Sequence, residues 1–260
     1  MDVLIESEPL PGIAQLVLNR PQSRNALDPQ LIARLRDRLA YHGQRDATRV
    51  VVLRAAGEAF CAGVDLRSMQ EQGQRELTDN VSDARTLAAL LSELRHLPKP
   101  TVVAVQGPAF GAGIGLVAAC DVAIGAEEAK FCLSEVRLGI IPAVISPYVI
   151  EAIGIRHARR YALTAEMMGA ERARNLGLLH EVVPTAALGG EALRFAMDLI
   201  QGGPQALAEC KSLLATIVTE AAGEERDARL AGLLARLRAG AEAQAGLTAM
   251  RSRQSPPWTP

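Results

Sequence analysis

The first fifty residues alternate between strand-like and helix-like hydrophobic patterns. Two strand-like runs, at residues 3–8 and 13–19, are separated by a Pro-Gly turn signal, which predicts a hairpin. Asp28 then precedes a proline, and the apolar residues behind it recur at helical spacing. The pattern predicts an amphipathic helix that is capped by Asp28 and buries the face formed by Leu31, Ile32, Leu35 and Leu39.

Continuous apolar runs indicate buried strands in the middle of the chain. Residues 49–54 and 101–105 are rich in valine, as is typical of strands that are covered on both faces. Shorter strands are expected at residues 121–125 and 130–133. A helix is expected around residues 87–97, where the prolines that follow would end it. Together, these elements predict that the first half of the chain has an α/β fold.

The second half of the chain changes to helical spacing almost throughout from Pro142 onward. Apolar positions recur at helical intervals in residues 188–200 and 204–218. No Gly/Ser linker separates the halves, so we expect one connected unit with an α/β core over residues 1–195 and a helical region over residues 196–260. The helical region has more apolar positions than one thin layer needs, which favours self-association.

Composition narrows the classes of function. The chain has 260 residues, 28 Lys plus Arg against 29 Asp plus Glu, and only 3% aromatic residues. The chain therefore has no excess of basic side chains to bind a phosphate backbone and few aromatic side chains to stack on bases, so we expect no nucleic-acid partner. The four cysteines lack metal or disulfide spacing, no apolar run is long enough to span a membrane, and the start lacks a basic signal region. We therefore expect a cytoplasmic globular protein without a bound metal or a membrane partner.

Two glycine-containing segments are candidates for ligand binding through the backbone. In residues 59–67, Gly63 permits a sharp turn that can leave the amide of Val64 pointing at a ligand. An ordinary strand-to-helix turn capped by Asp65 would give the same pattern. In residues 106–115, glycines at a strand-to-helix junction can form an oxyanion site, because the helix start offers free amides. Tight packing through small residues is compatible with that pattern, whereas the glycine spacing does not favour dinucleotide binding.

Glu135 is the candidate for proton transfer. It stands between two apolar runs, where a carboxylate can be partly desolvated and exchange protons near neutral pH. The alternative is a surface glutamate that pairs with Arg137. No Ser/His/Asp set can be assembled from the sequence, and the four histidines lack ligand spacing.

Taken in order, these segments resemble the crotonase, or enoyl-CoA hydratase/isomerase, superfamily. The resemblance covers nearly the whole chain and is carried by LNRP and NAL in residues 18–27, AFCAGVDL, KPTVVAVQGPAFGAGIGL, CDVAIGAEEAKFCLSEVRLGIIP and NLGLLHEVVP. It implies a spiral of ββα units with a C-terminal helical region that forms homotrimers, or hexamers built as dimers of trimers. It also implies an acyl-CoA thioester substrate and no further cofactor.

The resemblance assigns roles by position. The oxyanion hole falls on the backbone amides of Val64 and Ala112, which would hold the thioester oxygen as it gains enolate charge. Of the two glutamates that hydratases commonly use, one matches Glu135 and the other falls on Gly115, which has no side chain. The implied substrate and CoA contacts are Arg24, Ala26, Ala62, Asp65, Leu66, Arg67, Gly111 and, in the same or a neighbouring subunit, Arg253.

Gly115 leaves two reactions open. A single carboxylate resembles the Δ3,Δ2-enoyl-CoA isomerases, in which one glutamate moves a proton between two carbons. The run PAVISPY at residues 142–148 resembles bacterial hydratases of branched glutaconyl thioesters, of the 3-methylglutaconyl-CoA and isohexenylglutaconyl-CoA types. We therefore expect an enoyl-CoA hydratase, a carbon-oxygen lyase. A non-catalytic acyl-CoA-binding or RNA-binding member is the alternative from another class.

Overall fold

Strands in two sheets form the framework of the molecule. The computed structural model describes residues 2–259, in which the strands are β1 (Leu4–Leu10), β2 (Ile13–Leu18), β3 (Val50–Ala55), β4 (Thr101–Val105), β5 (Ala109–Phe110), β6 (Val122–Ala126), β7 (Lys130–Cys132), β8 (Met168–Gly169) and β9 (Glu181–Val183). The larger sheet has the order β1-β2-β3-β4-β6-β9, and the smaller has the order β5-β7-β8. Apart from the antiparallel β1-β2 hairpin, neighbouring strands of the larger sheet are parallel.

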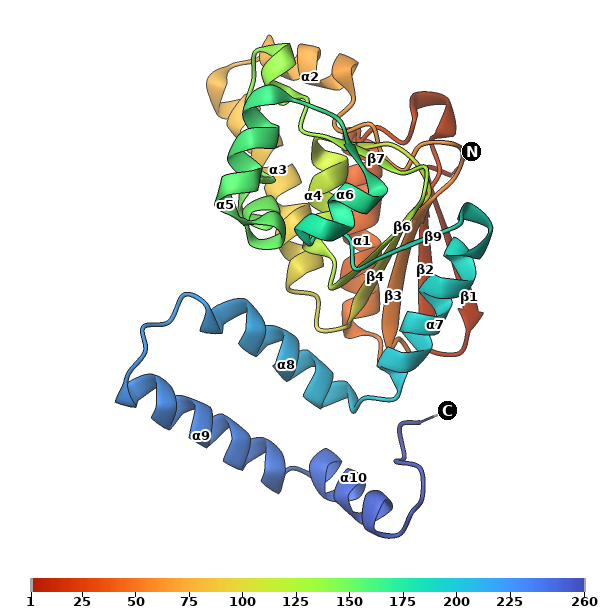
Figure 1. Ribbon diagram of the computed structural model, residues 1–260, viewed down its shortest axis with the longest axis vertical. Helices are drawn as coiled ribbons and strands as arrows, with labels where there is room; N and C mark the ends of the chain where they lie inside the picture. Colours follow the sequence, from red (N-terminus) through yellow and green to blue (C-terminus); the bar gives the residue numbers. More distant parts are fainter. Residues whose placement is uncertain (1, 260) are drawn as a thin grey trace.

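Helices cover the sheets and continue beyond them (Figure 1). They are α1 (Pro29–Gln44), α2 (Leu66–Gly73), α3 (Leu77–Arg95), α4 (Ala112–Ala119), α5 (Ser146–Thr164), α6 (Ala170–Leu176), α7 (Leu188–Ile200), α8 (Pro204–Ile217), α9 (Glu224–Ala239) and α10 (Ala241–Arg251), with short 3-10 turns at Pro21–Ser23, Glu135–Leu138 and Thr185–Ala187. The first helix begins as predicted, because the Asp28 carboxylate accepts a hydrogen bond of 2.8 Å from the Leu31 amide. Its predicted apolar face is buried.

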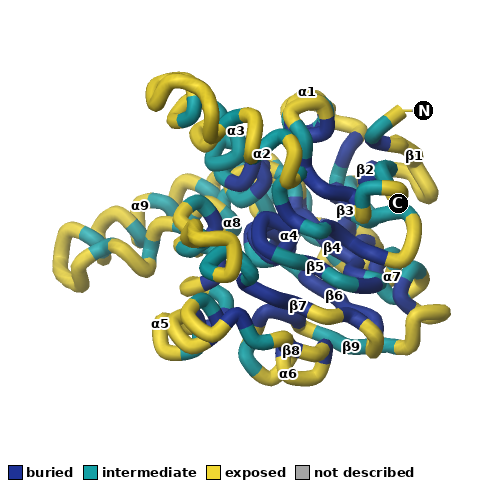
Figure 2. Tube along the Cα trace, turned by 90° about the horizontal axis from the view of Figure 1, so that it is seen from above, coloured by how far each residue is buried: buried dark blue, intermediate teal, exposed yellow. Residues whose placement is uncertain are grey.

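The larger sheet is buried on both faces, as its valine-rich strands predict. In β3, Val51 and Leu53 belong to the core that contains the buried residues of α1, α3 and α4. Val50 and Val52 point the other way and belong to a second core with Leu188 and the other buried residues of α7. Figure 2 shows these strands in dark blue between α4 and α7. This arrangement confirms the mixed α/β fold and fixes the strand ends from which the site loops start.

The last three helices lie away from this core (Figure 1). No residue of α8 or α9 is buried, and Leu214 and Leu234 are 58% and 57% exposed. An ion pair of 3.1 Å between Arg236 and Glu209 joins α9 to α8. Glu242 of α10 accepts hydrogen bonds from two amides in the first turn of α8. The three helices, called here the C-terminal arm, therefore hold one another while leaving apolar surface uncovered.

Three local expectations need correction. The helix expected around residues 87–97 begins earlier, at Leu77. Its first ten residues gave no signal in the sequence, because they are mostly exposed and carry no apolar periodicity. The half after Pro142 is not purely helical, since β9 adds a parallel edge strand to the larger sheet and β8 joins the smaller one. Helix α2 was expected only as one alternative, the strand-to-helix turn capped by Asp65, and it is a helix of eight residues. The proposed division at residue 195 falls inside α7 and stays a prediction.

Among residues 2–259, no helix combines the length and the apolar content that crossing a membrane requires.

Candidate active site

One large cleft, about 1290 Å³, brings together segments that are far apart in the sequence. It is lined by the loop after β2, the segment from Ala62 into α2, the start of α4, and the stretch between Ser134 and Ile145. Loops of this kind lie together because parallel strands end at the same edge of a sheet. The predicted site residues that line the cleft are Arg24, Ala26, Ala62, Val64, Asp65, Leu66, Arg67, Gly111, Ala112 and Glu135.

The first backbone donor of the cleft is the amide of Val64. The Leu27 amide donates to the Gly63 carbonyl at 2.7 Å, and the Asp65 amide donates to the Leu27 carbonyl at 2.9 Å. In such a parallel bridge the N–H of the residue between the two bonds points to the opposite side. The amide of Val64 therefore points away from this bridge, and Val64 lines the cleft.

Gly63 brings this loop close to the start of α4. Its φ of +98° lies in the region that favours glycine, and a Cβ there would lie 3.1 Å from the carbonyl oxygen of Phe110 and 3.7 Å from the amide nitrogen of Ala112. The loop that carries Val64 thus passes directly against the backbone that carries Ala112. The two predicted oxyanion donors belong to separate segments, the loop before α2 and the start of α4, and this close approach brings the two segments together.

The second donor is the amide of Ala112, the first residue of α4. A helix has no internal partner for its first amides, and its dipole favours negative charge at that end. The preceding Gly111 is fixed by its own amide, which donates to the Cys132 carbonyl at 3.0 Å. Alanine at position 112 has a backbone N–H like any residue except proline, so it can serve as this donor. The geometry therefore suits an oxyanion on the thioester carbonyl.

Glu135 lies over Gly111, at the start of the 3-10 turn that follows β7. A Cβ on Gly111 would lie 3.0 Å from Oε1 of Glu135. Its other oxygen, Oε2, is buried and has no hydrogen-bond partner among residues 2–259. Burial raises the pKa of Glu135, because the charged form loses hydration. Arg137 is exposed and forms no ion pair with it there, so the alternative of a surface glutamate paired with Arg137 is wrong.

The position of the second hydratase glutamate has neither a carboxylate nor space for one. A Cβ on Gly115 would lie 2.6 Å from Cγ2 of Ile145 and 3.2 Å from Cδ1 of Leu91. Ile145 is only 3% exposed and fills this volume from the start of α5. The sequence shows the glycine, but only the structure shows what occupies its place.

Two arginines at the mouth of the cleft have no carboxylate partner within residues 2–259. Arg24 and Arg67 line the cleft and form none of the ion pairs of that part of the chain. Guanidinium groups bind phosphate oxygens in a bidentate manner, so both can meet an anionic ligand.

Arg20 is a site residue that the motif analysis did not single out. One of its Nη atoms lies 3.0 Å from Oδ2 of Asp28 and 3.5 Å from Oδ2 of Asp65, and the other donates to the Ala26 carbonyl. Asp65 also accepts hydrogen bonds from two amides at the start of α2, which confirms its interpretation as a helix cap. Its carboxylate is therefore engaged, and its backbone amide and carbonyl are bonded to Leu27 and Met69.

Arg253 lies after α10 and does not line the cleft of its own chain. The C-terminal arm that carries it is separated from α2 in Figure 1. Its predicted contact with CoA stays a prediction that requires a neighbouring subunit. In the described part of the chain, no three His, Cys, Asp or Glu side chains form a group suited to a metal ion.

The comparisons with known proteins agree with this geometry. A model of the enoyl-CoA hydratase/isomerase family matches residues 9–260, and the chain belongs to this family. A crystal structure of an enoyl-CoA hydratase from Shewanella pealeana superposes with a TM-score of 0.95 at 39% identity, covering 98% of this chain and 96% of that one. The hydroxycinnamoyl-CoA hydratase-lyase of Pseudomonas fluorescens is 37% identical over 77% of this chain and 74% of its own. The 2,3-dehydroadipyl-CoA hydratase of Escherichia coli is 32% identical over 93% of this chain and 92% of its own.

Proposed function

We propose that the protein adds water across the 2,3 double bond of a 2-enoyl-CoA thioester. The observation that carries this proposal is the unpartnered, buried carboxylate oxygen of Glu135 in a cleft that also exposes the amides of Val64 and Ala112. The names of the relatives support hydration as the reaction. These names state different acyl groups, hydroxycinnamoyl in one relative and 2,3-dehydroadipyl in another.

The reaction needs one proton carrier and one oxyanion site. The amides of Val64 and Ala112 hold the thioester oxygen while the oxygen of a water bonds to C3 and Glu135 accepts the proton of that water. The electron pair of the C2=C3 bond moves to form the enolate, whose charge rests on the held oxygen. The enolate then collapses as Glu135 returns its proton to C2, which leaves a 3-hydroxyacyl thioester and the original carboxylate.

The two ends of the substrate meet different parts of the cleft. Arg24 and Arg67 would bind CoA phosphates, while Ala26, Ala62, Leu66 and Gly111 line the path from that mouth to Glu135. Beyond Glu135, residues 140–145 form an apolar wall. Arg137 lines the same part of the cleft and supplies a cation for a distal carboxylate. This supports a branched glutaconyl thioester, of the 3-methylglutaconyl-CoA or isohexenylglutaconyl-CoA type.

Isomerisation is the second candidate, and the contact between Gly115 and Ile145 favours it. With no second carboxylate, Glu135 could move a proton from C2 to C4 of a 3-enoyl thioester through the same enolate. The same two amides would stabilise that intermediate, so the oxyanion site alone does not separate the reactions.

Product mass separates the two candidates. The protein is incubated with crotonyl-, 3-methylglutaconyl- and isohexenylglutaconyl-CoA and with a 3-enoyl-CoA, and Glu135→Gln serves as the control for background hydration. A gain of one water from a 2-enoyl ester is the expected result. An unchanged mass with a shifted double bond from the 3-enoyl ester, and no hydrated product from any 2-enoyl ester, would establish the isomerase instead.

A further inference from the structure

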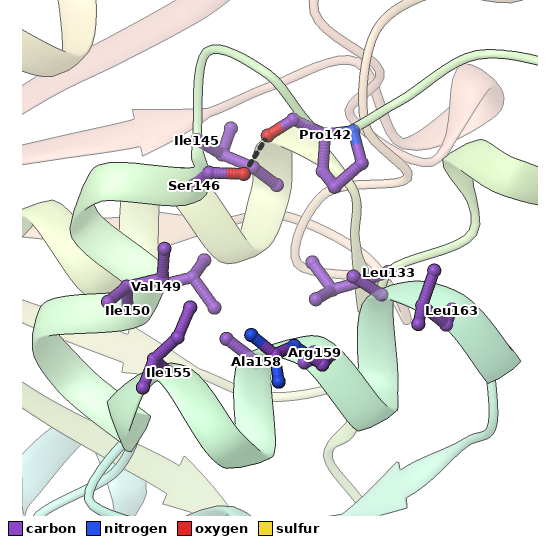
Figure 3. A pocket seen from close by; sticks show the side chains of 11 residues that line it. Leu133, Pro142, Ile145, Ser146, Val149, Ile150, Ile155, Ala158, Arg159 and Leu163 are labelled. Atoms are coloured by element: carbon purple, nitrogen blue, oxygen red, sulfur yellow. Dashed lines mark hydrogen bonds between the residues drawn. The ribbon is translucent and has the colours of Figure 1, made fainter.

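A second cavity lies next to the catalytic cleft and takes no part in the proposed chemistry. It has a volume of about 360 Å³ and lies between the two halves of α5, which meet at a break at Gly154 (φ 74°, ψ 152°). Its outer side is open to solvent, since Ile155 and Leu163 are 56% and 70% exposed. Its walls are almost entirely apolar, as Figure 3 shows for Leu133, Val149, Ile155 and Leu163. The Ser146 hydroxyl donates to the Pro142 carbonyl, so it offers no free donor to the interior. We call this space the α5 cavity.

The α5 cavity and the cleft share a wall. Ile145 and Pro142 line both of them. Leu133, on the far side of the wall, precedes Glu135 by two residues, which places the cavity roughly 7 Å along the chain from the proton carrier. Ile145 is 3% exposed and its side chain fills the gap beside Gly115. Its removal would therefore join the two spaces.

The acyl chain of a bound thioester would run toward this wall. The thioester oxygen is held at the amide of Ala112, and Gly115 lies three residues further along α4, a rise of about 4.5 Å. Cγ2 of Ile145 lies against Gly115, 2.6 Å from where a Cβ would be. An acyl chain that leads away from C1 along α4 therefore reaches Ile145 within a few carbons.

We propose that Ile145 sets the acyl-chain length that this enzyme accepts, by closing the cleft off from the α5 cavity. The α5 cavity is then an acyl compartment that straight apolar chains enter only when Ile145 is shortened. Each methylene that moves from water into it is worth roughly fourfold in binding. The direction of the acyl chain rests on the proposed function, but the closure by Ile145 rests on the lining of the two spaces.

The first experiment compares Ile145→Ala with Ile153→Ala. Ile153 is in the same helix and is 4% exposed, but it lines neither space, so it reports on loosening of α5 alone. For each variant, kcat/KM is measured with 2-butenoyl-CoA and 2-decenoyl-CoA. In Ile145→Ala the decenoyl-to-butenoyl ratio should rise at least about tenfold, and in Ile153→Ala it should stay within about twofold of wild type. If Ile145→Ala does not fold, Ile145→Val is measured in its place, with a smaller rise expected.

The second experiment refills the cavity. Ala162 lines the α5 cavity and not the cleft, so Ala162→Phe in the Ile145→Ala background should cancel the gain. An equal ratio in Ile145→Ala and Ile153→Ala, or a gain that survives Ala162→Phe, would overturn the inference.

The binding of saturated thioesters tests the role of Ile145 without requiring turnover. Butyryl-CoA and decanoyl-CoA carry no double bond, so their dissociation constants can be measured by calorimetry whether or not the enzyme is a hydratase. The decanoyl-to-butyryl affinity ratio should rise in Ile145→Ala and not in Ile153→Ala. A wild-type enzyme that hydrates no 2-enoyl ester would refute the proposed function, while this ratio would still decide the role of Ile145.

Discussion

Two features determine the state of the Glu135 carboxyl group: the space that Gly111 leaves beside it and its own burial. Gly111 leaves room for Oε1, because a Cβ there would lie only 3.0 Å away. Oε2 is buried without a partner, and burial raises the pKa of the group. A carboxylate in this state accepts a proton more readily than an exposed one, and it costs the folded state free energy when it is charged.

Glu135→Gln removes the proton carrier and keeps the shape of the side chain. We expect kcat to fall at least about a hundredfold while the dissociation constant of a saturated acyl-CoA stays close to that of wild type. In wild type, kcat/KM should fall as the pH decreases through the raised pKa of Glu135, above the ordinary value of 4.5. Turnover assays from pH 4 to 9 test both points. Near-normal turnover in the variant would refute the role of Glu135.

The same substitution should stabilise the folded protein. Because the pKa of Glu135 is raised on folding, the charged carboxylate destabilises the native state at pH values above that pKa. Gln is neutral, so its free energy of unfolding should exceed that of wild type at pH 7. The difference should shrink as the pH falls through the raised pKa toward 4.5, because Glu135 in the folded state then becomes protonated and loses the cost of a buried charge. Urea unfolding at pH 7 and pH 4.5 measures it, and a variant less stable than wild type at pH 7 would contradict it.

At the scale of elements, the first turn of α4 is packed against the start of α5 through Gly115 and Ile145. Gly115→Glu should therefore add no second catalytic carboxylate. We expect it to lower the free energy of unfolding by about 1–3 kcal/mol and to give no gain in turnover, because Ile145 occupies the space. Thermal unfolding and hydration assays provide the measurements.

Two further variants separate crowding from charge at this contact. Gly115→Ala adds only a Cβ, so it should lose stability by crowding alone, and Ile145→Ala in the same chain should restore part of the loss. A Gly115→Glu protein that is as stable as wild type and hydrates faster would contradict the prediction, because it would show that the start of α5 moves to make room for the side chain.

The elements that sequence analysis predicted are those whose signals are local. The Asp28 cap, the valines of β3 and the glycines beside Val64 and Ala112 each act within a few residues. Ile145 could not be predicted, because it meets Gly115 from another helix thirty residues away. The exposed first half of α3 gave no periodicity, and β9 is too short to alternate. The candidate site was predicted mostly from the resemblance, since no residue pattern alone joins these loops.

At the scale of the whole molecule, the C-terminal arm has apolar surface and no core of its own. Its helices α8 and α9 have no buried residue in the described chain. Such a surface is typical of a region that is covered by other subunits. The expected trimer or hexamer would supply that cover, and it would also decide whether Arg253 reaches a neighbouring cleft.

We expect the protein to sediment as a trimer or a hexamer at micromolar concentration. Leu234→Glu places a charge at a 57% exposed position of the arm and should shift the protein toward the monomer. Leu77→Glu, at a 76% exposed position of α3 outside the arm, is the matched control and should leave the assembly unchanged. Equilibrium sedimentation distinguishes these outcomes, and a wild-type monomer would contradict the prediction.

Arg20 links two helix starts that are otherwise independent. Asp28 caps α1, Asp65 caps α2, and the guanidinium of Arg20 contacts both carboxylates. Opening either first turn therefore leaves the other cap with a weakened partner. In native-state hydrogen exchange, amides that open together share one opening free energy and respond to denaturant in the same way. We therefore expect the first turns of α1 and α2 to exchange as one unit, so that the two walls of the cleft mouth open and close together.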